Sequence, residues 1–180
     1  MGWSSYHAKN YKRNGQIDKK AELDEGWEKG YRVLKSTMHG NIYYAAIERT
    51  SDSGEKIVFA VIGLTHSNLK DYMNFSYKLM DETMGPYNYD CPNSILDLLS
   101  PTDSEWANEW RKKCREHNRK PKLCKLPIGS MISYENFEGE KIILEKCAPN
   151  YQFKKTWWYR PAKNTYVPSR RIPDDWEQIS

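Results

Sequence analysis

Carboxylates, aromatic rings and turn-forming residues are concentrated in residues 71–92, which read DYMNFSYKLMDETMGPYNYDCP. This stretch contains adjacent carboxylates at Asp81 and Glu82 and a further one at Asp90. Carboxylates placed together can bind a divalent cation or transfer protons. Because Gly and Pro interrupt regular structure, we expect these side chains to project from a shaped loop. Loops held on a scaffold often carry function.

A catalytic or metal-binding role needs partner residues, and the sequence supplies none by spacing. None of the four cysteines lies in a CxxC pair, and the four histidines are scattered along the chain. Zinc sites usually show paired ligand spacing. Cys91 opens a predicted helix, where the pKa of a thiol can be lowered, but no His is tied to it. We therefore expect no catalytic residue, no metal site and no cofactor, and a protein that is not an enzyme.

Acidic side chains can instead imitate phosphates and occupy a nucleic-acid groove in a partner protein. On this hypothesis the candidate partner-binding residues are Asp81, Glu82, Tyr87, Tyr89 and Asp90. The alternative is a well-packed connection between a sheet and the helices after it, and the sequence leaves both open.

A second candidate surface is residues 151–171, YQFKKTWWYRPAKNTYVPSRR, with six basic residues, six aromatic residues and no acid. Nucleic-acid surfaces combine bases for phosphates with rings for stacking. Alternate residues of a strand face opposite sides, so Trp157 and Tyr159 should share the face opposite Trp158. The alternative is a solvated barrel face. The candidate nucleic-acid-binding residues are Lys154, Lys155, Trp157, Trp158, Arg160, Lys163, Arg170 and Arg171.

The charge of the chain changes sign abruptly although its net value is only +4. Residues 71–109 contain eight acids and one base, whereas residues 111–125 contain eight bases and one acid. Acids at the start and bases at the end of a helix complement its dipole, which explains part of this pattern. It does not explain Asp71, Asp81, Glu82 or Asp90, which precede the helix, and oppositely charged faces can steer charged partners.

The elements that position these residues begin with a sheet. We expect a strand at residues 3–8, an Asn-Gly hairpin at 11–17, and a helix at 19–28 capped by Asp18. Strands at 31–38, 42–50 and 56–64 should form an antiparallel meander. The third is apolar on both faces and should be central. Residues 72–80 are ambiguous between strand and helix.

Two helices follow the acidic stretch. The first, at residues 93–99, should turn Ile95, Leu98 and Leu99 inward. The second should start near Ser100, with Pro101 in its first turn or with a capping box from Thr102 to Glu105. It runs to about residue 118. Its buried stripe should contain Trp106, Trp110 and Cys114, with Ala107 beside them.

The best domain boundary lies at residues 118–125, and we divide the chain into an α+β domain at 1–120 and a small β domain at 121–180. Short strands separated by turn residues suggest an SH3-like or OB-like β-barrel. The predicted fold class is therefore α+β: an antiparallel meander sheet with packed helices, followed by a small β-barrel.

Composition and hydropathy set the expected location. Hydrophobic residues make up 38% of the chain, charged residues 29%, and the mean hydropathy is −0.90. No apolar run approaches the length that spans a membrane, and the first residues lack the apolar core of a signal peptide. We expect a cytoplasmic protein without a membrane partner, whose cysteines are reduced.

The chain resembles a family of small proteins from Firmicutes phages, plasmids and conjugative elements. The resemblance rests on MGWSSYHA and NGQIDKKAE, on FSYKLMDETMGPYNYDCPNSILDLLSPTDSEWANEWRKKCRE, and on LPIGSMISY with WW and RRIP near the end. It spans nearly the whole length, and the middle block is the specific part. The chain is also similar to a type II-A anti-CRISPR protein, an inhibitor of the RNA-guided nuclease.

This resemblance implies binding to a guide-loaded type II-A CRISPR nuclease in the bacterial host cell, with contact to double-stranded DNA as a further option and without catalysis. It carries over no individual contact residue. Such nucleases hold their heteroduplex in a positive channel, which acids of residues 81–90 can occupy. The alternative is a DNA- or RNA-binding accessory protein that acts through its basic aromatic barrel. A hydrolase that uses the acidic loop is a third, weaker interpretation.

Overall fold

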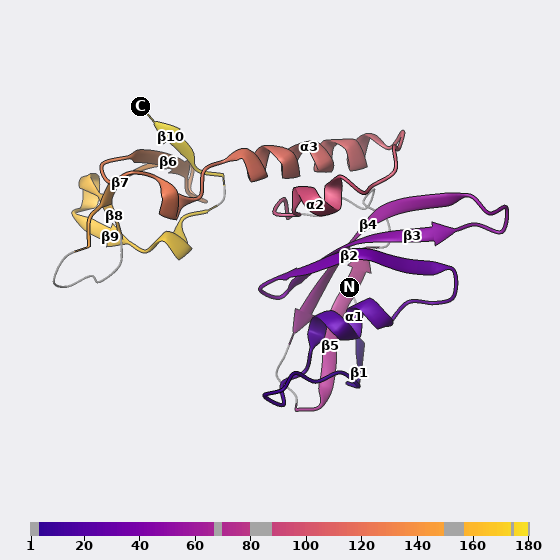
Figure 1. Cartoon of the computed structure of the whole chain (residues 1–180). Helices are drawn as coiled ribbons and strands as arrows, with labels where there is room; N and C mark the ends of the chain where they lie inside the picture. Colours follow the sequence, from indigo (N-terminus) through magenta and orange to yellow (C-terminus); the bar gives the residue numbers. More distant parts are fainter. Residues whose placement is uncertain (1–3, 67–69, 80–87, 150–156, 174, 180) are drawn as a thin grey trace. The chain divides into compact units, whose positions relative to one another are not determined.

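The chain folds into two compact units, Met1–Asn118 and Arg119–Ser180, whereas the sequence prediction divided it after residue 120. The structure is a computed structural model that describes residues 4–66, 70–79, 88–149, 157–173 and 175–179 (Figure 1). Each unit is built on its own antiparallel five-stranded sheet. Helices occur beside the sheets, so the α+β class is confirmed.

Sheet 1, in the first unit, has the strand order β1-β5-β4-β3-β2, and all of its neighbours are antiparallel. The meander and the central place of β4 are confirmed. Residues 72–79 form a strand, which resolves the ambiguity in the sequence. The strands are β1 (Ser4–His7), β2 (Tyr31–His39), β3 (Ile42–Thr50), β4 (Lys56–His66) and β5 (Tyr72–Leu79).

The hairpin and the first helix form where the turn and cap residues predict them. Tyr11 and Ile17 form a single antiparallel bridge around the Asn-Gly turn. Helix α1 (Lys19–Glu25) begins after Asp18, whose side chain accepts a hydrogen bond from the amide of Ala21 at 3.2 Å. Helix α1 ends three residues earlier than predicted, at a C-cap glycine.

Strand β3 is buried on both faces because helices cover both sides of sheet 1 (Figure 1). Tyr44 and Ala46 face the core cluster that contains Ile95 of α2 (Asn93–Leu96) and Trp110 of α3 (Glu105–Arg119). The alternate residues of β3 face the opposite core cluster, which contains Leu23 of α1. The first unit is therefore a three-layer sandwich, in which alternate residues of β3 face the two helical layers.

Two details of α2 and α3 differ from the sequence prediction. Leu98 is 40% exposed and Trp106 is 66% exposed, so neither belongs to the core. The buried stripe of α3 consists of Ala107, Trp110 and Cys114. These positions still follow the i, i+3, i+7 spacing of one helix face, and a residue as small as Ala107 allows a helix to approach a sheet closely.

The cap of α3 is also later than predicted: it is Ser104, four residues after Ser100 and two after the alternative, Thr102. Ser104 is the residue whose hydroxyl accepts from the amide of Ala107, at 3.3 Å. Ser100 instead forms two hydrogen bonds with Val58 of β4. Its hydroxyl accepts from the Val58 amide, and its own amide donates to the Val58 carbonyl, both at 2.9 Å.

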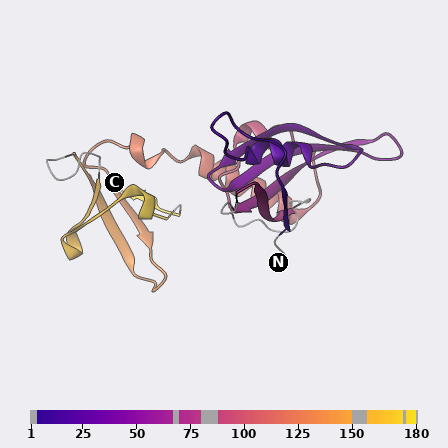
Figure 2. The ribbon, with the colours of Figure 1, turned by 90° about the horizontal axis from the view of Figure 1, so that it is seen from below.

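Sheet 2, in the second unit, has the strand order β10-β6-β7-β8-β9 (Figure 1), and Figure 2 shows the same ribbon from below. Among the described residues no ladder joins β9 to β10, so a closed barrel stays a prediction. Short 3-10 helices precede β6, separate β8 from β9, and precede β10. The elements are η2 (Leu123–Lys125), β6 (Met131–Glu135), β7 (Lys141–Cys147), β8 (Trp157–Arg160), η3 (Pro161–Lys163), β9 (Thr165–Val167), η4 (Ser169–Arg171) and β10 (Glu177–Ile179).

One face of sheet 2 forms the core of the second unit. Ile132, Leu144 and Trp158 are fully buried there, with Trp176 packed against them from the C-terminal segment. Lys146 lies on this same face and is only 3% exposed. Its ammonium group donates to the carbonyls of residues 123, 124 and 126, and thereby ties η2 to β7.

Candidate partner-binding site

The two candidate surfaces from the sequence are described to different extents. Asp81, Glu82 and Tyr87, together with Lys154 and Lys155, lie outside the described residues. Arg170 belongs to η4, and its side chain lies outside the described part of the structure. The site below is therefore built from the other predicted residues and from the side chains that surround them.

Asp90 is tied into the first unit by two partners. The phenolic oxygen of Tyr44 donates a hydrogen bond to Oδ1 of Asp90, and Nδ1 of His39 lies 3.2 Å from Oδ2. Burial raises the pKa of Tyr44, and the neighbouring carboxylate of Asp90 raises it further. Tyr44 therefore keeps its proton and remains a donor. Because both carboxylate oxygens have partners, Asp90 is an anchor for the chain rather than a freely presented acid.

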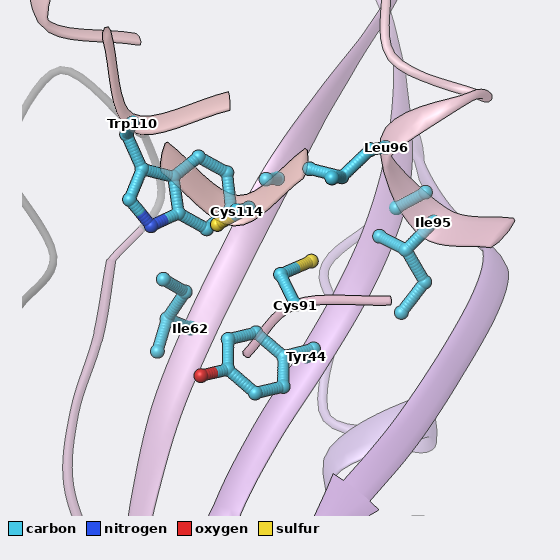
Figure 3. Close-up of a cluster of buried hydrophobic side chains, with 9 residues drawn as sticks. Tyr44, Ile62, Cys91, Ile95, Leu96, Trp110 and Cys114 are labelled. Carbon is cyan, nitrogen blue, oxygen red and sulfur yellow. The ribbon is translucent and has the colours of Figure 1, made fainter. Parts of the chain in front are cut away.

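The residues beside Asp90 are held in the same way. The indole of Trp110 donates to the carbonyl of Asn88 at 2.9 Å, and the side-chain amide Nδ2 of Asn118 donates to the carbonyl of Cys91 at 2.7 Å. Lys113 lies over the ring of Tyr89, 5.4 Å from its centroid. Figure 3 shows Cys91 among the side chains of this core cluster. Residues 88–91 thus form a fixed end to the acidic stretch, built on α3 and β3.

Trp158 does not belong to a binding surface. It has 0% exposure, and it is paired with Lys146 of β7 on the core face. Its indole nitrogen donates to the hydroxyl of Ser169 at 3.2 Å. The prediction that Trp158 contacts nucleic acid is therefore wrong, because a buried ring has no face to stack on a base. Trp157 and Tyr159 occupy the opposite face of β8, as the alternation predicted.

The face of sheet 2 opposite its core carries a continuous row of paired residues, which we call the outer row. Each residue of the outer row is paired with the next residue on the neighbouring strand, so the row crosses all five strands. The rings of Tyr159 and Tyr166 lie 5.3 Å apart, and the Tyr159 hydroxyl donates to Oδ1 of Asn164 at 3.0 Å. In spatial order the outer row is Ile179, Met131, Glu145, Tyr159 and Tyr166.

Further apolar side chains flank the outer row. Ile143 is 39% exposed, and Trp157 is paired with Cys147 at the next position on the same face. Met131 and Tyr166 of the outer row are 37% and 43% exposed. Met131, Ile143 and Ile179 were not among the predicted site residues. The sequence signal for this face was KIILEKC, which has apolar residues on both faces of a strand. A strand with one face in solvent should instead alternate apolar and polar residues.

Arg160, the predicted basic residue in β8, does not lie on this face. Arg160 follows Tyr159 in β8 and so points to the other side of the sheet, where its guanidinium forms an ion pair with Glu140 at 2.7 Å. Lys163 and Arg171 are exposed in η3 and η4. The charged side chain at the centre of the outer row is the carboxylate of Glu145. The structure therefore places Arg160 on the side of sheet 2 opposite the rings of Tyr159 and Tyr166.

Metal ligands are not gathered elsewhere in the described part of the chain: no group of three His, Cys, Asp or Glu side chains is placed to hold an ion. None of the described helices combines the length and the apolar character needed to cross a membrane. Comparisons with known protein families, with curated proteins and with solved structures found no match for this chain.

Proposed function

We propose that this chain is a non-catalytic mobile-element protein that binds and inhibits a type II-A RNA-guided CRISPR nuclease in the bacterial cytoplasm. The observation that supports a protein partner is the exposed apolar and aromatic face of sheet 2. Exposed apolar patches mark interaction sites, and Tyr, Trp and Met are enriched in protein interfaces. The choice of a nuclease as the partner rests on the sequence resemblance.

The charge of the outer row favours a protein over nucleic acid at this face. Glu145 lies between Met131 and Tyr159, where a stacked nucleic-acid strand would bring its phosphates close to a carboxylate. A protein that holds nucleic acid presents Lys and Arg, and these side chains complement both Glu145 and the neighbouring rings. Binding there would block access of DNA to the nuclease or its cleavage, without any chemical step by this chain.

We also propose that the second unit is a small SH3-like barrel. Its strands form a short antiparallel meander, β6 to β9, and the last strand, β10, returns to pair with the first. The 3-10 helix η4 directly precedes that return. β-Sheets twist in a right-handed sense, and in a small sheet of short strands this twist favours closure.

The proposal is tested with the full chain and a purified guide-loaded type II-A nuclease, by pull-down and then by titration. Tyr166→Ala removes an exposed ring of the outer row. We expect it to weaken binding by about tenfold or more, which corresponds to about 1.4 kcal/mol. Phe137→Ala is the matched control, because Phe137 is 97% exposed in the β6–β7 turn and lies outside the outer row. Failure of the nuclease to retain the wild-type chain would refute the function.

The acidic stretch is tested separately by charge reversal at Asp81 and Glu82. Asp90 is left intact because its carboxylate supports the fold through Tyr44 and His39. If nuclease inhibition is unchanged by the double reversal, these acids do not imitate phosphates, and the outer row alone carries the interaction.

The second candidate function is binding of DNA or RNA through the second unit. It is favoured by the charge of that unit, which has twelve basic and seven acidic residues in 119–180, and by the exposure of Lys163 and Arg171. A gel-shift assay with bare duplex DNA discriminates the two functions. Affinity that falls steeply as salt rises would favour this candidate, whereas weak DNA binding beside tight nuclease binding would favour the inhibitor.

A further inference from the structure

A lysine-rich pocket of about 870 Å³ lies in the first unit. It is bounded by the 11–17 hairpin, the start of α1, the end of β2 and the residues that precede β5. Four lysines line it, Lys12, Lys19, Lys20 and Lys70, beside the apolar side chains of Ile17 and Met38. Its volume falls within the range of small-molecule sites, which combine apolar walls with a few converging polar groups.

The ammonium group of Lys19 is held by neutral partners in this pocket. It lies 3.3 Å from Oδ1 of Asn41 and 3.4 Å from Oγ1 of Thr65, and both of these partners are neutral. Burial lowers the pKa of Lys19, and the positive charge of Lys12 lowers it further. Like charges held together at a concave surface raise the local concentration of anions.

Two carboxylates, Asp18 and Asp71, also line the pocket, beside the four lysines. Asp18 caps α1 through the amide of Ala21, and the charge of Asp71, in addition to the larger effect of burial, raises the pKa of Tyr11. Lys20 is the lysine with a carboxylate partner, Asp24, at 2.6 Å. Lys12, Lys19 and Lys70 are thus the cations that would face an anion.

The walls of the pocket are fixed by backbone hydrogen bonds. The amide of Asp18 donates to the carbonyl of Asn10 at 2.9 Å, which closes the base of the hairpin. The buried carboxylate of Glu22 accepts from the amides of Lys9 and Asn10. A lining that is held before a ligand arrives loses less conformational entropy on binding.

We propose that this pocket binds a small molecule that carries phosphate groups and is about the size of a nucleotide. The ammonium groups of Lys12, Lys19 and Lys70 contact the phosphate oxygens, as compact charges suited to phosphate. Ile17 and Met38 contact the uncharged part of the ligand. This site is independent of the outer row and of nuclease binding.

Calorimetric titration of the full chain with ADP, tripolyphosphate and adenosine tests the proposal. We expect ADP and tripolyphosphate to bind and adenosine to bind at least tenfold more weakly, because adenosine has no phosphate. Equal binding of adenosine and ADP, or no binding of either phosphate compound, would overturn the assignment. A twelve-nucleotide single strand serves as a further probe, and tighter binding of that strand than of ADP, if it is lost in Lys70→Gln, would show a nucleic-acid backbone as the ligand of this pocket, against the proposal.

Variants locate the binding. Lys19→Gln keeps hydrogen-bonding capacity toward Asn41 and Thr65 while it removes the charge. Lys70→Gln changes an exposed side chain. It therefore still tests the pocket if Lys19→Gln fails to fold. We expect each to weaken ADP binding by about tenfold. Lys29→Gln is the control, with the same charge change on an exposed lysine outside the pocket. Equal affinities of Lys70→Gln and Lys29→Gln for ADP would place the binding elsewhere.

Discussion

Lys146 offers the sharpest test of how the second unit is held together. Its ammonium group is buried on the core face of sheet 2 and donates to the carbonyls of Leu123, Cys124 and Leu126 at 3.1, 3.0 and 2.5 Å. An ammonium group has three donors and no acceptor, so these three bonds satisfy it completely. Lys146→Met keeps the aliphatic stem and removes all three.

The expected cost follows from the burial of the acceptors. Leu126 is buried, and its carbonyl without a donor costs about 1–3 kcal/mol. Leu123 and Cys124 are more exposed, so water can replace the lysine there and the loss is about 0.5–1 kcal/mol each. Removing a buried charge returns part of its desolvation penalty. We therefore expect Lys146→Met to lower the free energy of unfolding by about 2–3 kcal/mol.

The measurement is urea unfolding of the full chain, followed by hydrogen exchange of the β7 amides so that the second unit is observed by itself. Lys141→Met is the matched control on the same strand, since Lys141 is exposed. We expect it to change stability by less than about 0.5 kcal/mol. Equal urea midpoints for the two variants would show that the three bonds contribute nothing net, and would refute this account of how η2 is fixed.

Two further predictions concern the first unit. Trp110→Ala should cost about 3–5 kcal/mol through the cavity it leaves, whereas Trp106→Ala, at a side chain 66% exposed, should cost less than about 0.5 kcal/mol in the same urea titration. Tyr43 and Tyr44 have raised pKa values in the folded state. Their contribution to the free energy of unfolding is therefore complete below the ordinary tyrosine pKa of 10.0. It is lost as the pH rises above that value, by up to about 1.4 kcal/mol per pH unit for each ring. Tyr44→Phe should reduce that alkaline loss between pH 9 and 11, and an unchanged pH dependence would contradict the assignment.

Much of the fold follows from local sequence patterns. The meander strands follow from runs of β-branched and aromatic residues between turn residues, and the start of α1 follows from a capping Asp. In the buried stripe of α3, Trp110 and Cys114 were predicted correctly and Trp106 was wrong, because WANEWRKKC places either Trp106 or Ala107 at helical spacing from them. A large apolar side chain such as Trp106 is readily predicted to be buried. A small residue, however, allows the helix to pack more closely on the sheet.

The site was predicted less well because its geometry depends on distant residues. Alternation showed that Trp157 and Trp158 face opposite sides of a strand, but it cannot show which side is the core. The partners of Asp90 lie 46 and 51 positions away in the chain, which no local pattern reveals. The outer row likewise draws one residue from each of five strands, and it exists only once the registers are fixed.

The four thiols give each unit its own chemical reporter. Cys91 and Cys114 have 0% exposure in the same core cluster of the first unit (Figure 3), whereas Cys124 is exposed and Cys147 is half-buried in the second. Burial and the neighbouring Glu145 raise the pKa of Cys147, which slows its reaction because the thiolate is the nucleophile. An alkylating reagent added to the native chain therefore labels Cys124 first. Later labelling of Cys91 and Cys114 times the opening of the first unit, so one mass-spectrometric time course measures the two units separately without any engineered probe.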